Sequence, residues 1–79
     1  MRMWLKTLRK KRNLTQRELA SEFGIAPTTY AALEHGERQK DMGISIAIKI
    51  ADFFGISLST IRDYEEARII SESVRVKKK

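Results

Sequence analysis

Apolar residues recur at intervals of three and four along the whole chain, and this spacing constrains the fold more than any other feature of the sequence. Such spacing lines side chains up along one face of an α-helix, whereas a half-buried strand needs alternation at every second position. No alternating run is long enough to propose a sheet. The pattern therefore predicts an all-α fold. A chain of 79 residues makes one small domain, which buries about 60% of the surface that its unfolded form exposes.

Turn and capping residues divide this pattern into five helices. Thr15 and Glu18 in "TQRE" predict a capping box at the start of the second helix, and Gly24 supplies the left-handed turn that ends it. Pro27 suits the first position of the third helix, because its missing N–H would be unpaired there in any case. The expected helices are about Met3 to Arg12, Thr15 to Gly24, Pro27 to Gly36, residues 42–54 with Asp41 as cap, and a fifth capped by Ser57 that runs through Leu58, Ile61 and Tyr64.

The fourth helix is apolar on most sides, so we expect it to be the central helix of a compact five-helix bundle. One of its stripes carries Ile44, Ala47, Ile48, Ala51 and Phe54, and a second carries Ile46, Ile50 and Phe53. The domain is expected to span residues 3–64, with a helix-turn-helix at about 15–35. Residues 65–79 form a C-terminal extension or tail, which either joins two copies or is disordered.

The positive charge of the chain is concentrated at one end. The formal net charge is +6, and six bases with no acid lie between residues 2 and 12, namely Arg2, Lys6, Arg9, Lys10, Lys11 and Arg12. The remaining ten bases are balanced by ten acids. A basic cluster on a small domain suggests a polyanion as partner, most often nucleic acid. A solvated helix face explains the same cluster, so charge alone leaves both interpretations open.

Several classes of protein are disfavoured by what the sequence lacks. There is no Cys, and a single His35 cannot build a His-based metal site; it is better placed to cap the end of the third helix. No apolar run approaches the roughly 18 residues that span a bilayer. There is no Gly-rich phosphate loop and no nucleophile beside a base. We therefore expect a cytoplasmic protein that is not an enzyme, with no cofactor, no metal, no membrane association and no small-molecule ligand.

The stretch "LTQRELASEFGIAPTTYAALEHGER" followed by "IKIADFFGIS" resembles the Cro/phage-repressor type of helix-turn-helix regulator, also called the XRE family. The resemblance covers roughly residues 4–62. It rests on the combined spacing of a small residue at Ala20, a turn at Gly24, and Ile25, Tyr30 and Leu33 on the inner side. It implies a lambda-repressor-like five-helix DNA-binding domain, usually dimeric, that controls transcription from a palindromic operator.

The resemblance also implies roles for single residues. Pro27, Thr28, Ala31 and Ala32 match positions that read bases, Gln16, Thr29, Arg38 and Lys40 match positions that contact phosphates, and Arg9 and Glu34 match an ion pair between the first and third helices. The sequence departs from the family at the base-reading positions, where long polar side chains such as Gln or Arg are absent. Methyl contacts to thymine and one threonine hydroxyl are left to read bases, and DNA shape has to supply the rest.

Two functions remain open. The first is a sequence-specific DNA-binding transcriptional regulator, repressor-like, that works as a homodimer on double-stranded operator DNA. The second is a protein-binding module on the same fold, such as an antitoxin or anti-repressor. The weak recognition helix favours the second, whereas the basic first helix and the positions Gln16, Arg38 and Lys40 favour the first. Ile69, Ile70, Val74 and Val76 in the extension favour a homodimer, because small domains seldom leave such residues in water.

Overall fold

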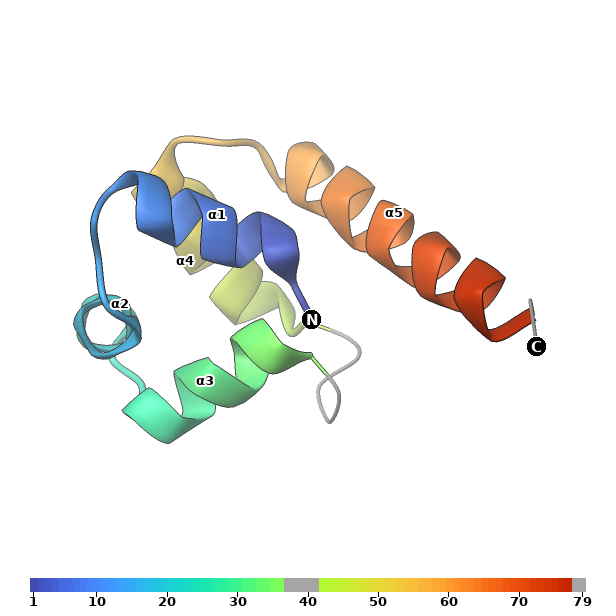
Figure 1. The fold of residues 1–79 in the computed structure, drawn as a ribbon. Helices are drawn as coiled ribbons and strands as arrows, with labels where there is room; N and C mark the ends of the chain where they lie inside the picture. Colours follow the sequence, from blue (N-terminus) through green and yellow to red (C-terminus); the bar gives the residue numbers. More distant parts are fainter. Residues whose placement is uncertain (37–41, 78–79) are drawn as a thin grey trace.

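The described residues form five helices and no strand. The helices are α1 (Met3–Lys11), α2 (Gln16–Phe23), α3 (Pro27–His35), α4 (Ile44–Phe54) and α5 (Leu58–Lys77). The computed structural model describes residues 1–36 and 42–77, without the side chains of residues 71–77. Figure 1 shows α1 above α3, α2 beside them, α4 behind α1, and α5 running outward at the upper right. The predicted all-α five-helix architecture is confirmed.

The start of α2 is held by the capping box that the sequence predicts. Thr15 Oγ1 accepts a hydrogen bond from the Glu18 backbone N–H at 3.1 Å, and the Glu18 carboxylate accepts one from the Thr15 N–H at 2.8 Å. These reciprocal bonds satisfy backbone donors that the first turn of a helix leaves without partners. α2 therefore begins at a residue that the sequence itself specifies.

The other helix starts use different devices. α3 begins with Pro27 after Ala26, which makes no side-chain cap, whereas Ser57 caps α5 by accepting a bond from the Thr60 N–H at 3.1 Å. α4 begins after Gly43. Asp41, the expected cap of that helix, lies outside the described residues.

One apolar core joins all five helices. Its buried members are Leu5, Leu19, Ala20, Phe23, Tyr30, Leu33, Ile50, Ala51, Phe54 and Ile61. Aromatic rings link α2 to α4, since Phe23 and Phe53 meet edge to face with centroids 5.9 Å apart. The side chains expected to face inward from α2 and α3 are therefore buried as the apolar spacing predicts.

α4 buries a narrower face than the sequence predicts. Ala47 and Phe54 are buried, but Ile44 and Ile48, which were expected on the same inward stripe, are 67% and 43% exposed. At 3.6 residues per turn these two side chains project about 60° and 100° away from the direction of Ala47. They lie on a flank that the described helices leave open to solvent. α4 contributes four buried side chains to the core, but it is less enclosed than was expected of a central helix.

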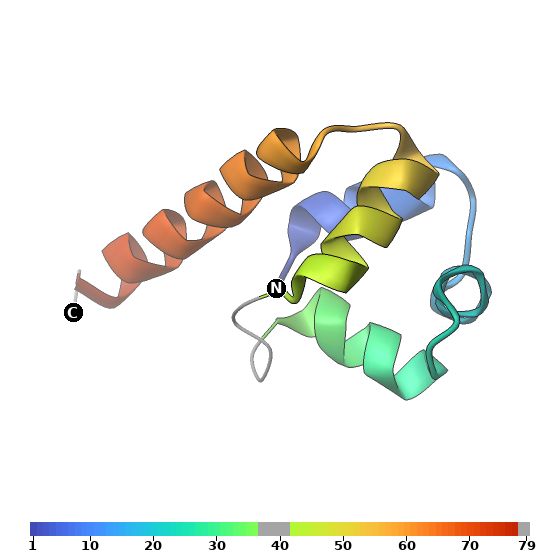
Figure 2. The same cartoon turned by 180° about the vertical axis from the view of Figure 1, so that it is seen from behind.

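α5 continues past the expected end of the domain. No Gly or Pro occurs between Leu58 and Lys77, and the helix shows no break at residues 64 and 65, where the extension was expected to begin. Glu65 is tied to the N-terminal segment through Trp4, whose Nε1 donates to its carboxylate at 2.8 Å. The first turn of the expected extension, Glu65 to Arg68, therefore packs against the rest of the domain. Figure 2 shows the rest of α5 projecting away from the other helices.

Neither a membrane-spanning helix nor a metal-binding cluster occurs among the residues that the structure describes. No single helix there is long and apolar enough to cross a bilayer, and α4 with part of α5 reaches that length only as a pair bent by 114°. No three His, Cys, Asp or Glu side chains of that part of the chain lie together as metal ligands.

Candidate nucleic-acid interface

The turn between α2 and α3 directs the outer face of α3 away from the core. Gly24 adopts a left-handed conformation with φ of 69°, and the Ile25 N–H donates to the Ala20 carbonyl at 3.0 Å to close the end of α2. In Figure 1, α2 is seen end-on while α3 runs across the view, so the two helices cross steeply. Tyr30 and Leu33 are buried and fix the inner face of α3. The opposite face of α3 is left on the surface of the molecule.

The outer face of α3 carries small, uncharged side chains. Pro27, Thr28 and Thr29 are exposed, and Ala31 and Ala32 are partly buried. These five side chains offer methyl and methylene groups and two hydroxyls, so bidentate pairing to a guanine or adenine edge has no donor fork here. Their small size allows another surface to approach the helix backbone closely.

The acid of α3, Glu34, is buried and points into the molecule. Its carboxylate accepts hydrogen bonds from Arg9 Nε at 2.9 Å and Arg9 Nη2 at 3.1 Å, which places the expected ion-pair partners in direct contact. It also accepts a bond from the Tyr30 hydroxyl at 2.8 Å and one from Gln16 Nε2 at 3.0 Å. One carboxylate therefore ties α1, α2 and α3 together.

This network stabilises the charged forms of the acid and the base. Burial alone would raise the pKa of the Glu34 carboxyl, but hydrogen bonds from Arg9, Gln16 and Tyr30 outweigh it and lower that pKa below its ordinary value. The hydrogen bond to Glu34 raises the pKa of Arg9. Burial, together with the hydrogen bond to Glu34, raises the pKa of the Tyr30 hydroxyl. Glu34 therefore stays ionised at neutral pH without presenting its charge on the outer face of α3.

Gln16 stands at the N-terminus of α2 on the edge of a shallow depression of about 420 Å³. The depression is lined by Arg9, Lys10, Asn13, Leu14, Thr15 and Gln16. The bond to Glu34 uses one N–H of the Gln16 carboxamide, which has two. A lysine, an amide and the positive end of a helix together make a surface suited to an anion. Arg38 and Lys40, the other predicted phosphate contacts, lie outside the described residues.

The N-terminal basic cluster divides into two chemically different sets. Arg2 and Arg9 are buried in ion pairs with acids of α5 and α3. The Arg12 guanidinium lies 5.1 Å and 5.0 Å from the Phe53 and Phe54 ring centroids and donates to the Phe53 carbonyl at 3.0 Å. Lys6, Lys10 and Lys11 are half-buried or exposed. Arg2 and Arg9 therefore serve the fold, whereas the lysines and the exposed Arg12 still place positive charge on the surface.

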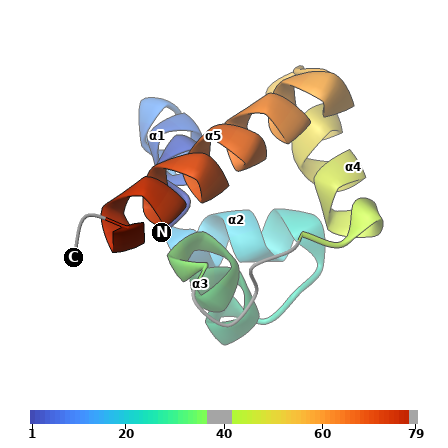
Figure 3. The same ribbon diagram turned by 90° about the vertical axis from the view of Figure 1, so that its right-hand side faces the viewer.

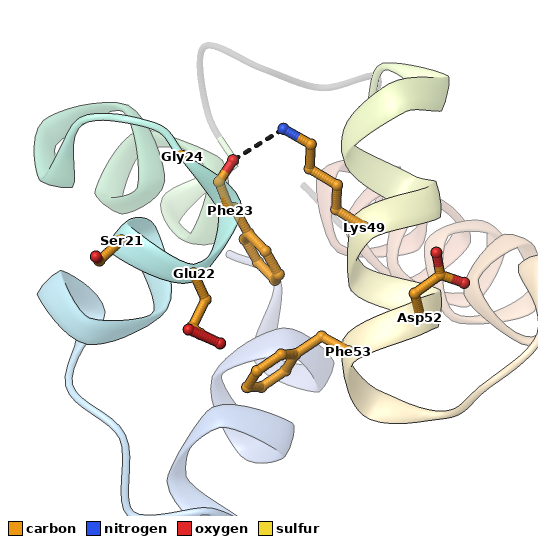
Figure 4. Close-up of a pocket in the computed structure, with 7 residues that line it drawn as sticks. All are labelled: Ser21, Glu22, Phe23, Gly24, Lys49, Asp52 and Phe53. Carbon is orange, nitrogen blue, oxygen red and sulfur yellow. Dashed lines mark hydrogen bonds between the residues drawn. The ribbon is translucent and has the colours of Figure 1, made fainter.

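Lys49 of α4 is a residue of this region that the sequence did not single out. Its ammonium group donates to the carbonyl of Phe23, the last residue of α2, at 2.9 Å (Figure 4). The bond crosses a depression of about 550 Å³ between α2 and α4, lined by Ser21, Glu22, Phe23, Gly24, Lys49, Asp52 and Phe53. A cation at a helix C-terminus is favoured by the helix dipole. Lys49 thus fixes the end of α2, from which the turn to α3 departs.

Comparison with known proteins agrees with this geometry. A family model described as helix-turn-helix matches residues 5–61, a span that includes α2, the turn and α3. A protein of Methanocaldococcus jannaschii, named as an uncharacterized HTH-type transcriptional regulator, is 39% identical over 66 residues, which are 84% of this chain and 97% of that relative. No solved structure matches the chain. The chain therefore belongs to the Cro/phage-repressor-type, or XRE, family of helix-turn-helix transcriptional regulators.

Proposed function

We propose that this protein is a repressor-like, sequence-specific regulator that acts in the cytoplasm and inserts α3 into the major groove of a palindromic operator. The observation that carries the proposal is the outer face of α3, whose side chains are small, uncharged and either exposed or partly buried, while the acid of this helix is buried inside. A major groove about 12 Å wide admits an α-helix. A carboxylate on that face would be repelled by the phosphates, and Glu34 is held inside by Arg9. The relative from Methanocaldococcus jannaschii, named as an HTH-type transcriptional regulator, supports a role in transcription.

In this proposal the bases are read through methyl groups and one hydroxyl. Pro27, Ala31 and Ala32 meet thymine methyls, and Thr28 bonds a base edge through its hydroxyl, which both donates and accepts. Such contacts discriminate weakly, so the deformability of the operator contributes to sequence preference at positions that α3 does not touch.

Phosphates on either side of the groove hold α3 in place. Gln16 reaches one phosphate from the N-terminus of α2, with Glu34 orienting its carboxamide from the other side. Thr29 bonds a second phosphate through its hydroxyl. Arg38 and Lys40 follow α3 in the sequence and contact the backbone beyond the helix. Contacts of this kind determine the register of a protein on DNA but carry no sequence information.

Two copies of the chain act together through α5. Ile69 and Ile70 of α5 are 46% and 63% exposed. A second copy packed along this segment removes them from water and places two α3 helices on one face of the DNA. Half-sites of such a dimer lie about 34 Å apart, one helical turn of DNA.

The test is selection of bound sequences from a random duplex pool, followed by gel shifts of the selected DNA at increasing salt. We expect a palindrome to be enriched, and a slope of log affinity against log salt of about −0.9 for each neutralised phosphate. Lys40→Ala should weaken all sequences alike and flatten the slope by up to about 1. Arg62→Ala is the matched control, because Arg62 is an exposed base on α5 that is paired with Asp63. A protein that enriches no sequence and shifts no DNA would instead support the protein-binding alternative.

A further inference from the structure

Arg2 is buried at the junction between α3 and α5. Its backbone N–H donates to the Glu34 carbonyl at 2.8 Å, and its Nη1 donates to the Leu33 carbonyl at 2.6 Å. Both carbonyls belong to the last turn of α3, where the helix itself supplies no donors. Arg2 therefore caps the C-terminus of α3 with a positive charge, and the helix dipole favours a cation there. The side chain is fully shielded from solvent.

The same guanidinium also holds α5. Its Nε donates to the two carboxylate oxygens of Glu65 at 3.1 Å and 3.0 Å, and Trp4 Nε1 donates to the same carboxylate at 2.8 Å. Figures 1 and 3 show the N-terminus beside the C-terminal end of α3, and in Figure 3 α5 runs above both. One buried cation thus bridges the helix that carries the base-reading positions and the helix proposed to join two copies.

Arg68 tightens this junction from α5. Its Nε lies 3.6 Å from the Glu65 carboxylate. Gly36, which ends α3, has φ of 78°, and a Cβ atom added there would lie 3.2 Å from Arg68 Nη1. A larger residue at Gly36 would therefore press against the arginine. The connection between α3 and α5 is therefore made by side chains, those of Arg2, Glu65 and Arg68.

We propose that Arg2 is a positioning residue that sets the angle between α3 and α5, and through it the half-site spacing that a dimer accepts. The proposal rests on the proposed function, in which α5 joins two DNA-binding copies. The separation of the two α3 helices then depends on how each α3 is attached to its own α5. One added base pair moves a half-site by about 3.4 Å and rotates it by about 35°. A dimer with rigid junctions rejects that change, whereas one with loose junctions tolerates it.

The experiment compares Arg2→Met with the matched control Arg62→Met. Both remove one positive charge, but Arg62 is 68% exposed and pairs only with its neighbour Asp63 among the described contacts. Glu65→Gln is a second variant, used if Arg2→Met fails to fold, because it keeps an acceptor for Trp4 and removes the charge facing Arg2. Each protein is titrated against the selected palindrome, against the same palindrome with one base pair inserted or deleted at its centre, and against a single half-site duplex.

The wild type and Arg62→Met should prefer the selected spacing by about 100-fold or more, because avidity is lost when both half-sites cannot be engaged together. Arg2→Met should reduce that preference to less than about tenfold while its affinity for the single half-site stays within about twofold. The positioning role is excluded if Arg2→Met is less stable but keeps the full spacing preference. It is also excluded if single half-site affinity falls as much as palindrome affinity, since Arg2 would then act on the reading surface itself.

A measurement without DNA separates this inference from the proposed function. Residual dipolar couplings of backbone amides in α3 and α5 report the angle between the two helices. We expect one fixed angle in the wild type and in Arg62→Met, and a changed or averaged angle in Arg2→Met. If the wild type binds no DNA, the proposed function fails while the couplings still test the junction. If the angle is the same in Arg2→Met, the junction does not depend on Arg2 and the inference is wrong.

Discussion

The Glu34 carboxylate holds α1, α2 and α3 together, because it accepts hydrogen bonds from side chains of all three helices. Replacing it by Gln keeps the shape but removes the charge that faces Arg9 and turns an amide N–H toward one of the donors. Breaking a buried ion pair from one side costs about 3–5 kcal/mol. We expect Glu34→Gln to lower the free energy of unfolding by this order, measured by urea denaturation. Glu22→Gln, an exposed acid on α2, is the control and should change it by less than about 0.5 kcal/mol.

The same carboxylate predicts a dependence of stability on pH. The pKa of Glu34 is lowered in the folded protein relative to its ordinary value of 4.5. Its contribution is therefore complete above pH 4.5 and is lost as the pH falls through the lower folded-state value. Urea denaturation from neutral pH to about pH 3 should show a steeper loss of stability in the wild type than in Glu34→Gln. Parallel curves for the two proteins would mean that the pKa of Glu34 is the same in the folded and the unfolded protein.

A substitution at Thr28 tests base reading without affecting folding. Its side chain is exposed on the outer face of α3 and lies outside the core. Thr28→Ala should change the preference at one base pair by about 1–3 kcal/mol while the melting temperature is unchanged. Thr7→Ala, an exposed threonine on α1, is the control and should alter neither quantity. Selection of bound sequences with each variant measures the effect, and an unaltered sequence preference for Thr28→Ala would remove Thr28 from the reading surface.

Among the helices, α2 and α3 differ in how they begin. α2 has a reciprocal capping box, whereas Ala26 occupies the N-cap of α3 with an extended backbone, φ −69° and ψ 148°, and no side-chain acceptor. Ala26→Ser should therefore raise the free energy of unfolding by about 1 kcal/mol, and Thr15→Ala should lower it by about the same amount. Urea denaturation of both variants provides the comparison. If Ala26→Ser has no effect while Thr15→Ala is destabilising, Pro27 alone determines where α3 starts.

For the molecule as a whole, we expect a homodimer joined through the projecting part of α5. Ile70→Asp should convert a sedimenting dimer into a monomer with unchanged helix content, because a charge replaces an apolar side chain that is 63% exposed in the single chain. Ile44→Asp is the control and should remain a dimer, because Ile44 is similarly exposed, at 67%, but lies on α4. A truncation after Tyr64 is less informative, because it also removes Glu65, which holds Arg2. A monomeric wild type at high concentration, or dissociation of Ile44→Asp as well, would contradict an α5 interface.

The local architecture of this protein could be predicted from the sequence. Three local features set the ends of α2 and the start of α3: the capping box at Thr15, the left-handed Gly24 and Pro27. Each acts on neighbours within four residues, so its effect can be predicted from the sequence. The combined helix-turn-helix spacing indicated the family in the same way. The contact between Arg9 and Glu34 was expected from the resemblance alone. The base contacts of α3 and the phosphate contacts of Gln16, Arg38 and Lys40 remain predictions.

The tertiary structure decided what the charged and apolar side chains do. Arg2, Arg9 and Arg12 look alike in a basic segment, yet two are buried against acids and one stacks on aromatic rings. The partner of Arg2 is 63 residues away in the chain, and no local pattern encodes a pairing at that distance. For the same reason Ile44 and Ile48 appeared to be core residues, since periodicity shows which side chains share a helix face but not whether another helix covers it. Burial and pairing depend on how the helices pack, and packing is a property of the whole chain.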